Sequence, residues 1–245
     1  DISACRDNLN MLIKVMSDVD KSADTSKWQE LEKNLPPYLY DETGALKEWA
    51  TTSFDENNEH RHLSHLYGVW PLFETQGNEK LSKACEQAIA NRQSENEASH
   101  ALVHRSLIAS RLKDSDSLTD ALVKLMNHKI RYDSLMTNHD YDQGSCYCTD
   151  FAIGYLGIIN EALVYSHNDD IEFLPALPNS GFENGTLKGI KTRNRATVTE
   201  LKWADGGKTI SATVTSDIDQ KLNIKVGGKS QTVEFKAGES KTFKF

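Results

Sequence analysis

Three imidazoles and one guanidinium lie within one short stretch of the chain, in the side chains of His60, Arg61, His62 and His65. If this stretch is helical, His62 and His65 lie one turn apart on one face, beside an apolar stripe formed by Leu63 and Leu66. A helix that buries its leucines and points several polar rings the same way suits the lining of a polar cleft. We expect the rest of the chain to surround that cleft.

Several kinds of chemistry fit these histidines. Imidazoles are common zinc ligands, so His60, His62 and His65 could form a metal site. Arg61, between two of them, is an unfavourable neighbour for a cation. Histidines hydrogen-bonded around a loop-to-helix junction are a second possibility, and polar contacts to a bound ligand are a third. We favour ligand contacts, and we predict neither a metal site nor a cofactor.

Asp150 is the second candidate because it ends a polar loop directly before an apolar helix. It could cap that helix by accepting hydrogen bonds from first-turn amides. It could instead act as a general base aimed into a cleft. His100 and His104 are spaced one helical turn apart, and a hydrogen-bonded pair is the plainer interpretation. Glu161 lies within the apolar helix and would need a buried partner there.

Composition narrows the class of protein and its partners. The 245 residues are 38% hydrophobic and 26% charged, with a formal net charge of −8. This charge argues against nucleic acid or an anionic membrane as the partner, because both attract basic patches. It fits a neutral substrate such as a sugar. No apolar run reaches the roughly 20 residues of a membrane span, and no signal peptide opens the chain.

Hydrophobic spacing divides the chain into a helical part and a β part. Helical spacing recurs in five segments, 7–18, 26–34, 79–92, 97–112 and from Ser115, and a sixth, 151–165, is apolar on nearly every side and therefore expected to be buried. Trp28 and Leu31 are expected to face inward. After residue 167, alternating patterns predict strands at 171–174, 195–203, 209–215, 221–226, 231–235 and 241–245. Glycine pairs between them predict hairpin turns in an antiparallel β unit.

Two motifs resemble those of glycoside hydrolase family 95, a family of inverting α-L-fucosidases and α-L-galactosidases. They are Leu-Lys-Glu-Trp at 46–49 and His-Arg-His-Leu-Ser-His-Leu-Tyr-Gly at 60–68. The segment Cys-Thr-Asp at 148–150 resembles the family's Gln-Ile-Asp. Residues 171–178 resemble the segment that leads into its C-terminal domain. The resemblance is collinear over nearly the whole chain.

The resemblance implies part of an (α/α)6 toroid over residues 1–167, followed by an antiparallel β-sandwich-like domain over 168–245. It also implies that this chain is the C-terminal portion of a longer protein. Nothing before His60 matches the segments that hold the family's general-acid Glu and an Asn pair. The N-terminal part of the same protein is therefore an expected partner. Asp150 falls on the position of the catalytic Asp, and His62 falls on that of a substrate-contacting His.

We therefore predict an inverting exo-glycosidase that hydrolyses α-L-fucosyl or α-L-galactosyl groups from an oligosaccharide or glycoconjugate. Asp150 would be the catalytic residue in this chain. The predicted sugar contacts are His60, Arg61, His62, His65, His100 and His104. The isolated chain is expected to be inactive, because its general acid is missing. A glycan substrate favours a secreted or cell-surface bacterial protein.

The chain departs from the family pattern in three places, and Ala152 with the imidazoles at 100 and 104 supports an alternative, a non-catalytic glycan-binding module on a decayed hydrolase fold. The family continues Asp-Gly-Asn-Phe-Gly where this chain has Asp-Phe-Ala-Ile-Gly at 150–154. Cys148 and Thr149 replace Gln-Ile. His100 and His104 replace two tryptophans.

Overall fold

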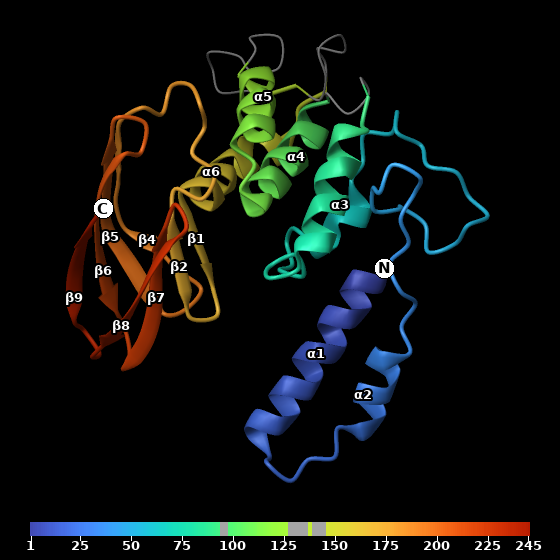
Figure 1. Ribbon diagram of the computed structural model, residues 1–245, viewed down its shortest axis with the longest axis horizontal. Helices are drawn as coiled ribbons and strands as arrows, with labels where there is room; N and C mark the ends of the chain where they lie inside the picture. The colour runs from blue at the N-terminus through green and yellow to red at the C-terminus, as the bar shows by residue number, and fades with distance from the viewer. Residues whose placement is uncertain (94–97, 127–136, 139–145) are drawn as a thin grey trace. The chain divides into compact units, whose positions relative to one another are not determined.

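Helices precede residue 164 and strands follow it in the computed structural model, as the hydrophobic spacing predicts (Figure 1). The structure describes residues 1–93, 98–126, 137–138 and 146–245. They fall into two units, Asp1–Asn96 and Glu97–Phe245, which are described in turn. Among the described helices, none has both the length and the apolar character needed to cross a bilayer.

The described residues of the first unit form three α-helices and one 3-10 turn. They are α1 (Ile2–Val19), α2 (Ser26–Lys33), η1 (Ser64–Gly68) and α3 (Glu79–Ala90). Helix α1 packs against α2 and against η1. Five large apolar side chains of this helix pair are exposed, namely Met11, Leu12, Val15, Val19 and Leu31. The expectation that Leu31 faces inward is therefore wrong, since α1 covers only part of the apolar surface of α2.

A tight turn joins α2 to the histidine segment. Tyr40 and Leu46 pair as an antiparallel bridge. Between them, the Oδ1 atom of Asp41 accepts the backbone N–H groups of Thr43 and Ala45, each at 2.9 Å. The backbone N–H of Leu46 then donates to the carbonyl of Ala84 in α3 at 3.0 Å. This turn is therefore anchored directly to a helix.

The second unit begins with α4 (Ser99–Leu112), α5 (Ser115–Leu125) and α6 (Thr149–Leu163). Helix α4 is buried along most of its length and packs against both α5 and α6. Helix α6 is less buried than predicted. Ile153 and Leu156 are 77% and 70% exposed. Because the α6 sequence is apolar on nearly every side, it predicts a helix that is buried all round. Within the described residues, however, other elements cover only one side of α6.

Nine described strands form two sheets in the second unit. One sheet has the order β1-β2-β7-β8, and the other has the order β3-β5-β6-β9 with β4 paired to β5. Their bounds are β1 Val164–His167, β2 Asp170–Phe173, β3 Gly185–Leu187, β4 Ile190–Lys191, β5 Ala196–Ala204, β6 Thr209–Ser216, β7 Gln220–Val226, β8 Lys229–Phe235 and β9 Ser240–Lys244. Strand β2 pairs with β7 in parallel, so the expectation of a purely antiparallel unit is wrong.

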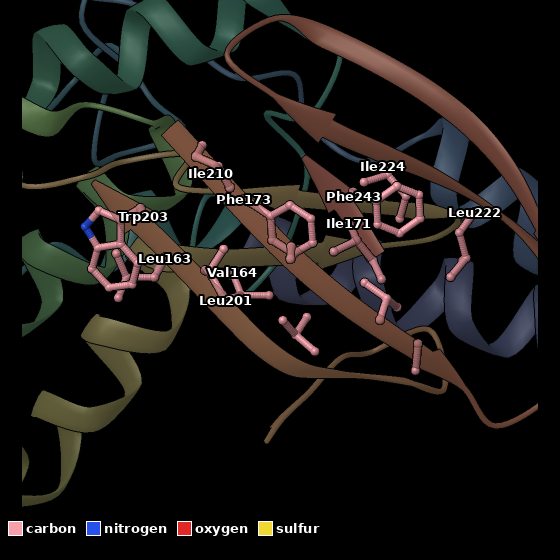
Figure 2. Close-up of a cluster of buried hydrophobic side chains, with 14 of the residues drawn as sticks. Leu163, Val164, Ile171, Phe173, Leu201, Trp203, Ile210, Leu222, Ile224 and Phe243 are labelled. Atoms are coloured by element: carbon pink, nitrogen blue, oxygen red, sulfur yellow. The ribbon is translucent and has the colours of Figure 1, made fainter. Parts of the chain in front are cut away.

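One hydrophobic core lies between these strands (Figure 2). Alternate residues of β5 and β6 point into it, as their period-two pattern predicts. Ile171, Phe173 and Ile224 of the first sheet join the same cluster as Leu201 and Phe243 of the second. The two sheets therefore share a single core. The predicted division of the chain at residue 167 stays a prediction.

A buried ionic cluster joins α4, α6 and the β part of the second unit. Glu161 of α6 lies 3.1 Å from Nη2 of Arg111 in α4 and also accepts a short hydrogen bond from Arg193, between β4 and β5. The Arg111 side chain is completely buried. Burial lowers the pKa of Arg111, and the neighbouring Glu161 carboxylate opposes that shift. The partner that Glu161 requires is thus a pair of guanidinium groups.

We predict that Glu161→Ala lowers the free energy of unfolding by about 3–5 kcal/mol, because it leaves the buried Arg111 without its carboxylate. Denaturant unfolding of the 245-residue chain measures this. Glu234→Ala is the matched control, because Glu234 pairs with Lys221 on the surface and its side chain is 80% exposed. That change should cost less than about 1 kcal/mol. Equal losses for the two variants would contradict a special role for the cluster.

Candidate functional site

The N-terminus of α6 fixes the position of Asp150. The backbone N–H of Cys148 donates to the Thr137 carbonyl at 3.0 Å, and Oγ1 of Thr137 donates to the Cys148 carbonyl at 2.5 Å. Cys148 is the N-cap residue of α6, so Asp150 lies inside the first turn. The interpretation of Asp150 as the cap is therefore wrong. A carboxylate in the first turn is stabilised by the helix dipole, and its oxygens stay available because they do not accept hydrogen bonds from the helix amides.

Asp150 lies beside an imidazole of α4. Its Oδ1 atom is 3.6 Å from Nδ1 of His100, and its side chain is 52% exposed. The rings of His100 and His104 are 4.5 Å apart between centroids, as their one-turn spacing predicts. The structure therefore brings three of the predicted site residues together on two neighbouring helices. A half-exposed carboxylate held next to an imidazole can accept a proton from a water molecule.

Gly154 allows α6 to approach α4 closely at this point. A Cβ atom at Gly154 would lie 2.8 Å from Cγ1 of Val103, one turn along α4 from His100. Real side chains do not pack that closely, so any larger residue would push the two helices apart. The contact between Asp150 and His100 depends on this close packing, because both residues lie one turn away from it.

The histidine segment is mostly not helical. Only Ser64–Gly68 forms a helix, a single 3-10 turn, and His60 and His62 precede it. The prediction that His62 and His65 lie on one face of a helix is therefore wrong. Leu63 and Leu66 are both buried, although Leu63 precedes the turn and the two leucines form no helical stripe. The rings of His60 and His62 lie 4.8 Å apart between centroids.

Arg92 holds this segment in place, and the sequence analysis did not identify it. It follows α3, and its side chain is only 2% exposed. Its guanidinium donates to the Asn57 carbonyl at 2.5 Å and to the His60 carbonyl at 3.3 Å. Nη2 of Arg92 also lies 3.4 Å from the carboxylate of Glu48 and 3.4 Å from Nδ1 of His65. One buried cation therefore connects the Glu48 and histidine motifs.

His65 is kept neutral by this arrangement. Burial lowers the pKa of the His65 imidazole to about 3, and the positive charge of Arg92 adds to the effect. A neutral imidazole offers one N–H donor and one acceptor. His65 can therefore form hydrogen bonds with uncharged groups across the whole physiological pH range.

The arrangement does not fit a metal ion at His60, His62 and His65. A guanidinium next to His65 would repel a cation. In the part of the chain that the structure describes, no three His, Cys, Asp or Glu side chains converge as a ligand set. The described cysteines are all free thiols.

Comparison with protein families decides the affiliation of the chain. The glycosyl hydrolase family 95 catalytic domain model matches residues 1–163, and the C-terminal domain model of the same family matches residues 165–245. The chain belongs to glycoside hydrolase family 95. The resemblance inferred from the histidine motif is thereby confirmed.

Two curated relatives also match this family 95 chain. It is 27% identical over 220 residues to "Alpha-L-fucosidase 2" of Arabidopsis thaliana, a match that covers 84% of this chain and 25% of the relative. It is 28% identical over 196 residues to "Probable alpha-fucosidase A" of Aspergillus oryzae, and this match covers 70% of this chain and 27% of the relative. The family 95 chain thus spans about a quarter of the length of these relatives.

A solved structure shares the fold of this family 95 chain. "Putative kojibiose phosphorylase from human microbiome" superposes with a TM-score of 0.53 and 15% sequence identity, over 98% of this chain and 38% of that one. At this identity the likeness concerns the fold alone.

The predicted site residues thus fall into two groups. Asp150, His100 and His104 lie together in the second unit. His60, His62 and His65 lie near Arg92 in the first. That both groups of this family 95 chain line one cleft stays a prediction.

We predict that the His65 ring does not titrate between pH 8 and pH 5 in an NMR titration, with His65→Gln used to assign its resonance. The unfolded chain binds a proton at His65 below a pKa of about 6.5, whereas the folded chain does not. This residue should therefore reduce the free energy of unfolding by up to about 1.4 kcal/mol per pH unit as the pH falls from 6.5 towards 3. A titration midpoint near 6.5 would contradict the buried, Arg92-paired state.

We predict that Gly154→Ala destabilises the chain, whereas Gly157→Ala does not. Alanine gains about 1 kcal/mol over glycine in a helix. At Gly154 the clash with Val103 should cost about 1–3 kcal/mol and outweigh that gain. At Gly157 the new Cβ atom would meet Leu107 at an ordinary 4.0 Å. Thermal unfolding measures both variants, and a Gly154→Ala variant as stable as Gly157→Ala would contradict the close packing.

Proposed function

We propose that this chain is the C-terminal part of an inverting exo-glycosidase that removes α-L-fucosyl, or the related α-L-galactosyl, groups from an oligosaccharide or glycoconjugate. Membership of family 95 and the names of the two curated relatives support the substrate class. The observation that carries the catalytic assignment is the half-exposed Asp150 carboxylate, 3.6 Å from His100 in the first turn of α6.

Inversion requires two carboxyl groups with different tasks. One protonates the oxygen of the leaving group, while the other removes a proton from a water molecule that attacks the anomeric carbon from the opposite face. They stand about 6.5–9.5 Å apart, which leaves room for the water. In our proposal Asp150 is the base and His100 orients it. The acid belongs to chain outside these 245 residues, so this chain alone should not turn over substrate.

Neutral sugars are recognised by directional hydrogen bonds rather than by charge. We assign this task to His60, Arg61, His62 and His65, with His104 as a further contact near Asp150. Arg92 supports the assignment, because it fixes the loop through two backbone carbonyls. Side chains on a loop held this way keep their geometry when a ligand binds.

The exposed apolar faces indicate that another part of the same polypeptide packs against them. Helices α1 and α6 each expose large apolar side chains, including Met11, Val15, Ile153 and Leu156. Contiguous exposed apolar surface is typical of sites where protein packs. We propose that the upstream part of the toroid covers these faces, and that the complete protein acts outside the cell.

A second candidate is a glycan-binding module without catalysis. The contact between His100 and Asp150 favours it, because an imidazole replaces the aromatic residue usual in the family and engages the proposed base. Measurable hydrolysis by the longer protein would exclude this candidate. Saturable glycan binding without hydrolysis of a broad panel of glycosides would favour it.

We predict that Asp150→Asn in the longer protein lowers kcat for an α-L-fucoside by about 10²–10⁴-fold, because the amide cannot accept the proton of the attacking water. The KM should change much less. Steady-state kinetics measures both constants. NMR of the wild-type reaction should show the released sugar first as the β-anomer, since inversion converts an α-glycoside into a β-product.

Asp169→Asn serves as the control for this change, because Asp169 is an exposed turn residue between β1 and β2. It should leave kcat unchanged. Activity of Asp150→Asn within a few fold of the wild type would refute the base assignment. Initial release of the α-anomer would refute inversion.

A further inference from the structure

A hollow with both apolar and polar walls lies in the first unit, beside the histidine segment. Its volume is about 430 Å³. Glu48 and Trp49, which follow the turn at 41–45, form one wall. His65 of the histidine segment forms part of another. Pro36 and Pro37, which follow α2, form another wall. Small-molecule sites occupy about 300–1,000 Å³, so the hollow has room for a ligand of one or two sugar rings.

The apolar part of the hollow offers a flat surface. Trp49 is 46% exposed, although indole rings are usually buried. The Phe54 ring packs edge-on against it, with centroids 5.5 Å apart, and so fixes its plane. The negative face of an aromatic ring attracts weakly positive C–H groups. One face of a pyranose ring presents a row of such C–H groups, which makes Trp49 a suitable stacking surface.

The polar part of the hollow suits uncharged hydroxyl groups. Glu48 supplies carboxylate oxygens that accept hydrogen bonds. His65 is neutral, and because Arg92 donates to one ring nitrogen, its other ring nitrogen can donate to a ligand. Arg92 holds both side chains in place. The Glu48 carboxylate would repel an anionic ligand, and Arg92 behind it would repel a cationic one. The chemistry of the walls therefore favours a neutral, hydroxyl-rich ligand.

We propose that this hollow binds a neutral pyranose ring of the glycan next to the sugar that is removed, stacked on Trp49 and hydrogen-bonded to Glu48 and His65. The proposal rests on the proposed glycosidase function, because it assigns a neighbouring sugar of the same substrate. It makes the protein selective for oligosaccharides over simple fucosides. A fucoside with a small aromatic leaving group lacks the ring that would occupy the hollow.

The test compares two substrates of the longer protein, 2′-fucosyllactose and 4-nitrophenyl α-L-fucoside. Trp49→Ala should lower kcat/KM for the trisaccharide at least tenfold, mainly through KM, and leave the nitrophenyl substrate within about twofold. Trp49→Phe keeps an aromatic face and should retain most of the activity. Tyr67→Ala is the matched control, since Tyr67 is another exposed aromatic residue but does not line the hollow. Equal losses on both substrates, or no loss on the trisaccharide, would overturn the proposal.

A binding measurement separates this proposal from the glycosidase function. Lactose should quench the tryptophan fluorescence of the wild-type protein saturably, and this response should disappear in Trp49→Phe. Thermal unfolding verifies that each variant is folded. Quenching together with no hydrolysis of either substrate would support the sugar site and refute the glycosidase. Hydrolysis without lactose-dependent quenching would refute the sugar site alone.

Discussion

The second unit depends on one buried carboxylate, Glu161, which is held by two guanidinium groups. Arg111 comes from α4 and Arg193 from the β part, so this acid connects a helix pair to a sheet. Both charges of the Arg111–Glu161 pair have left water, and such a pair is stable only when each member keeps its partner. Helix α6 therefore cannot shift along α4 without exposing an uncompensated charge.

This anchorage explains how Asp150 can be placed accurately by a helix that is partly uncovered. Glu161 fixes the C-terminal end of α6, and β1 continues directly from it. Gly154 sets the distance to α4 near the other end. Asp150 lies one turn further on, beside His100. In the first unit, Arg92 has a comparable task, because one buried cation holds two loop carbonyls, a carboxylate and an imidazole.

Local features could be predicted well from the sequence because they depend on neighbouring residues. The prolines at 36–37 follow the end of α2, and both glycines at 227–228 have the positive φ that a tight hairpin between β7 and β8 requires. The strands with clear alternation lie within a few residues of their predicted bounds. The motif around His62 identified the family, and the family models confirm it.

Long-range features could not be predicted in this way. Alternation is the same in parallel and antiparallel strands, so the parallel pairing of β2 with the distant β7 leaves no local signal. Arg92 resembles a surface charge after a helix, and only the fold brings it to the carbonyls of Asn57 and His60. Because it satisfies those carbonyls, the segment has less need of the helical hydrogen bonds that we expected. Periodicity likewise shows that α6 is apolar but not which neighbour covers each face.

The central claim is that His62 and Asp150 act on the same sugar. A crystal structure of the longer protein carrying Asp150→Asn, with an uncleaved fucosyl oligosaccharide bound, tests it most directly. We predict a water molecule within about 3 Å of the side chain at position 150, opposite the leaving group, and a hydrogen bond from His62 to the same terminal sugar. A terminal sugar bound away from position 150, or a position 150 side chain that faces solvent while His62 contacts the sugar, would contradict the account.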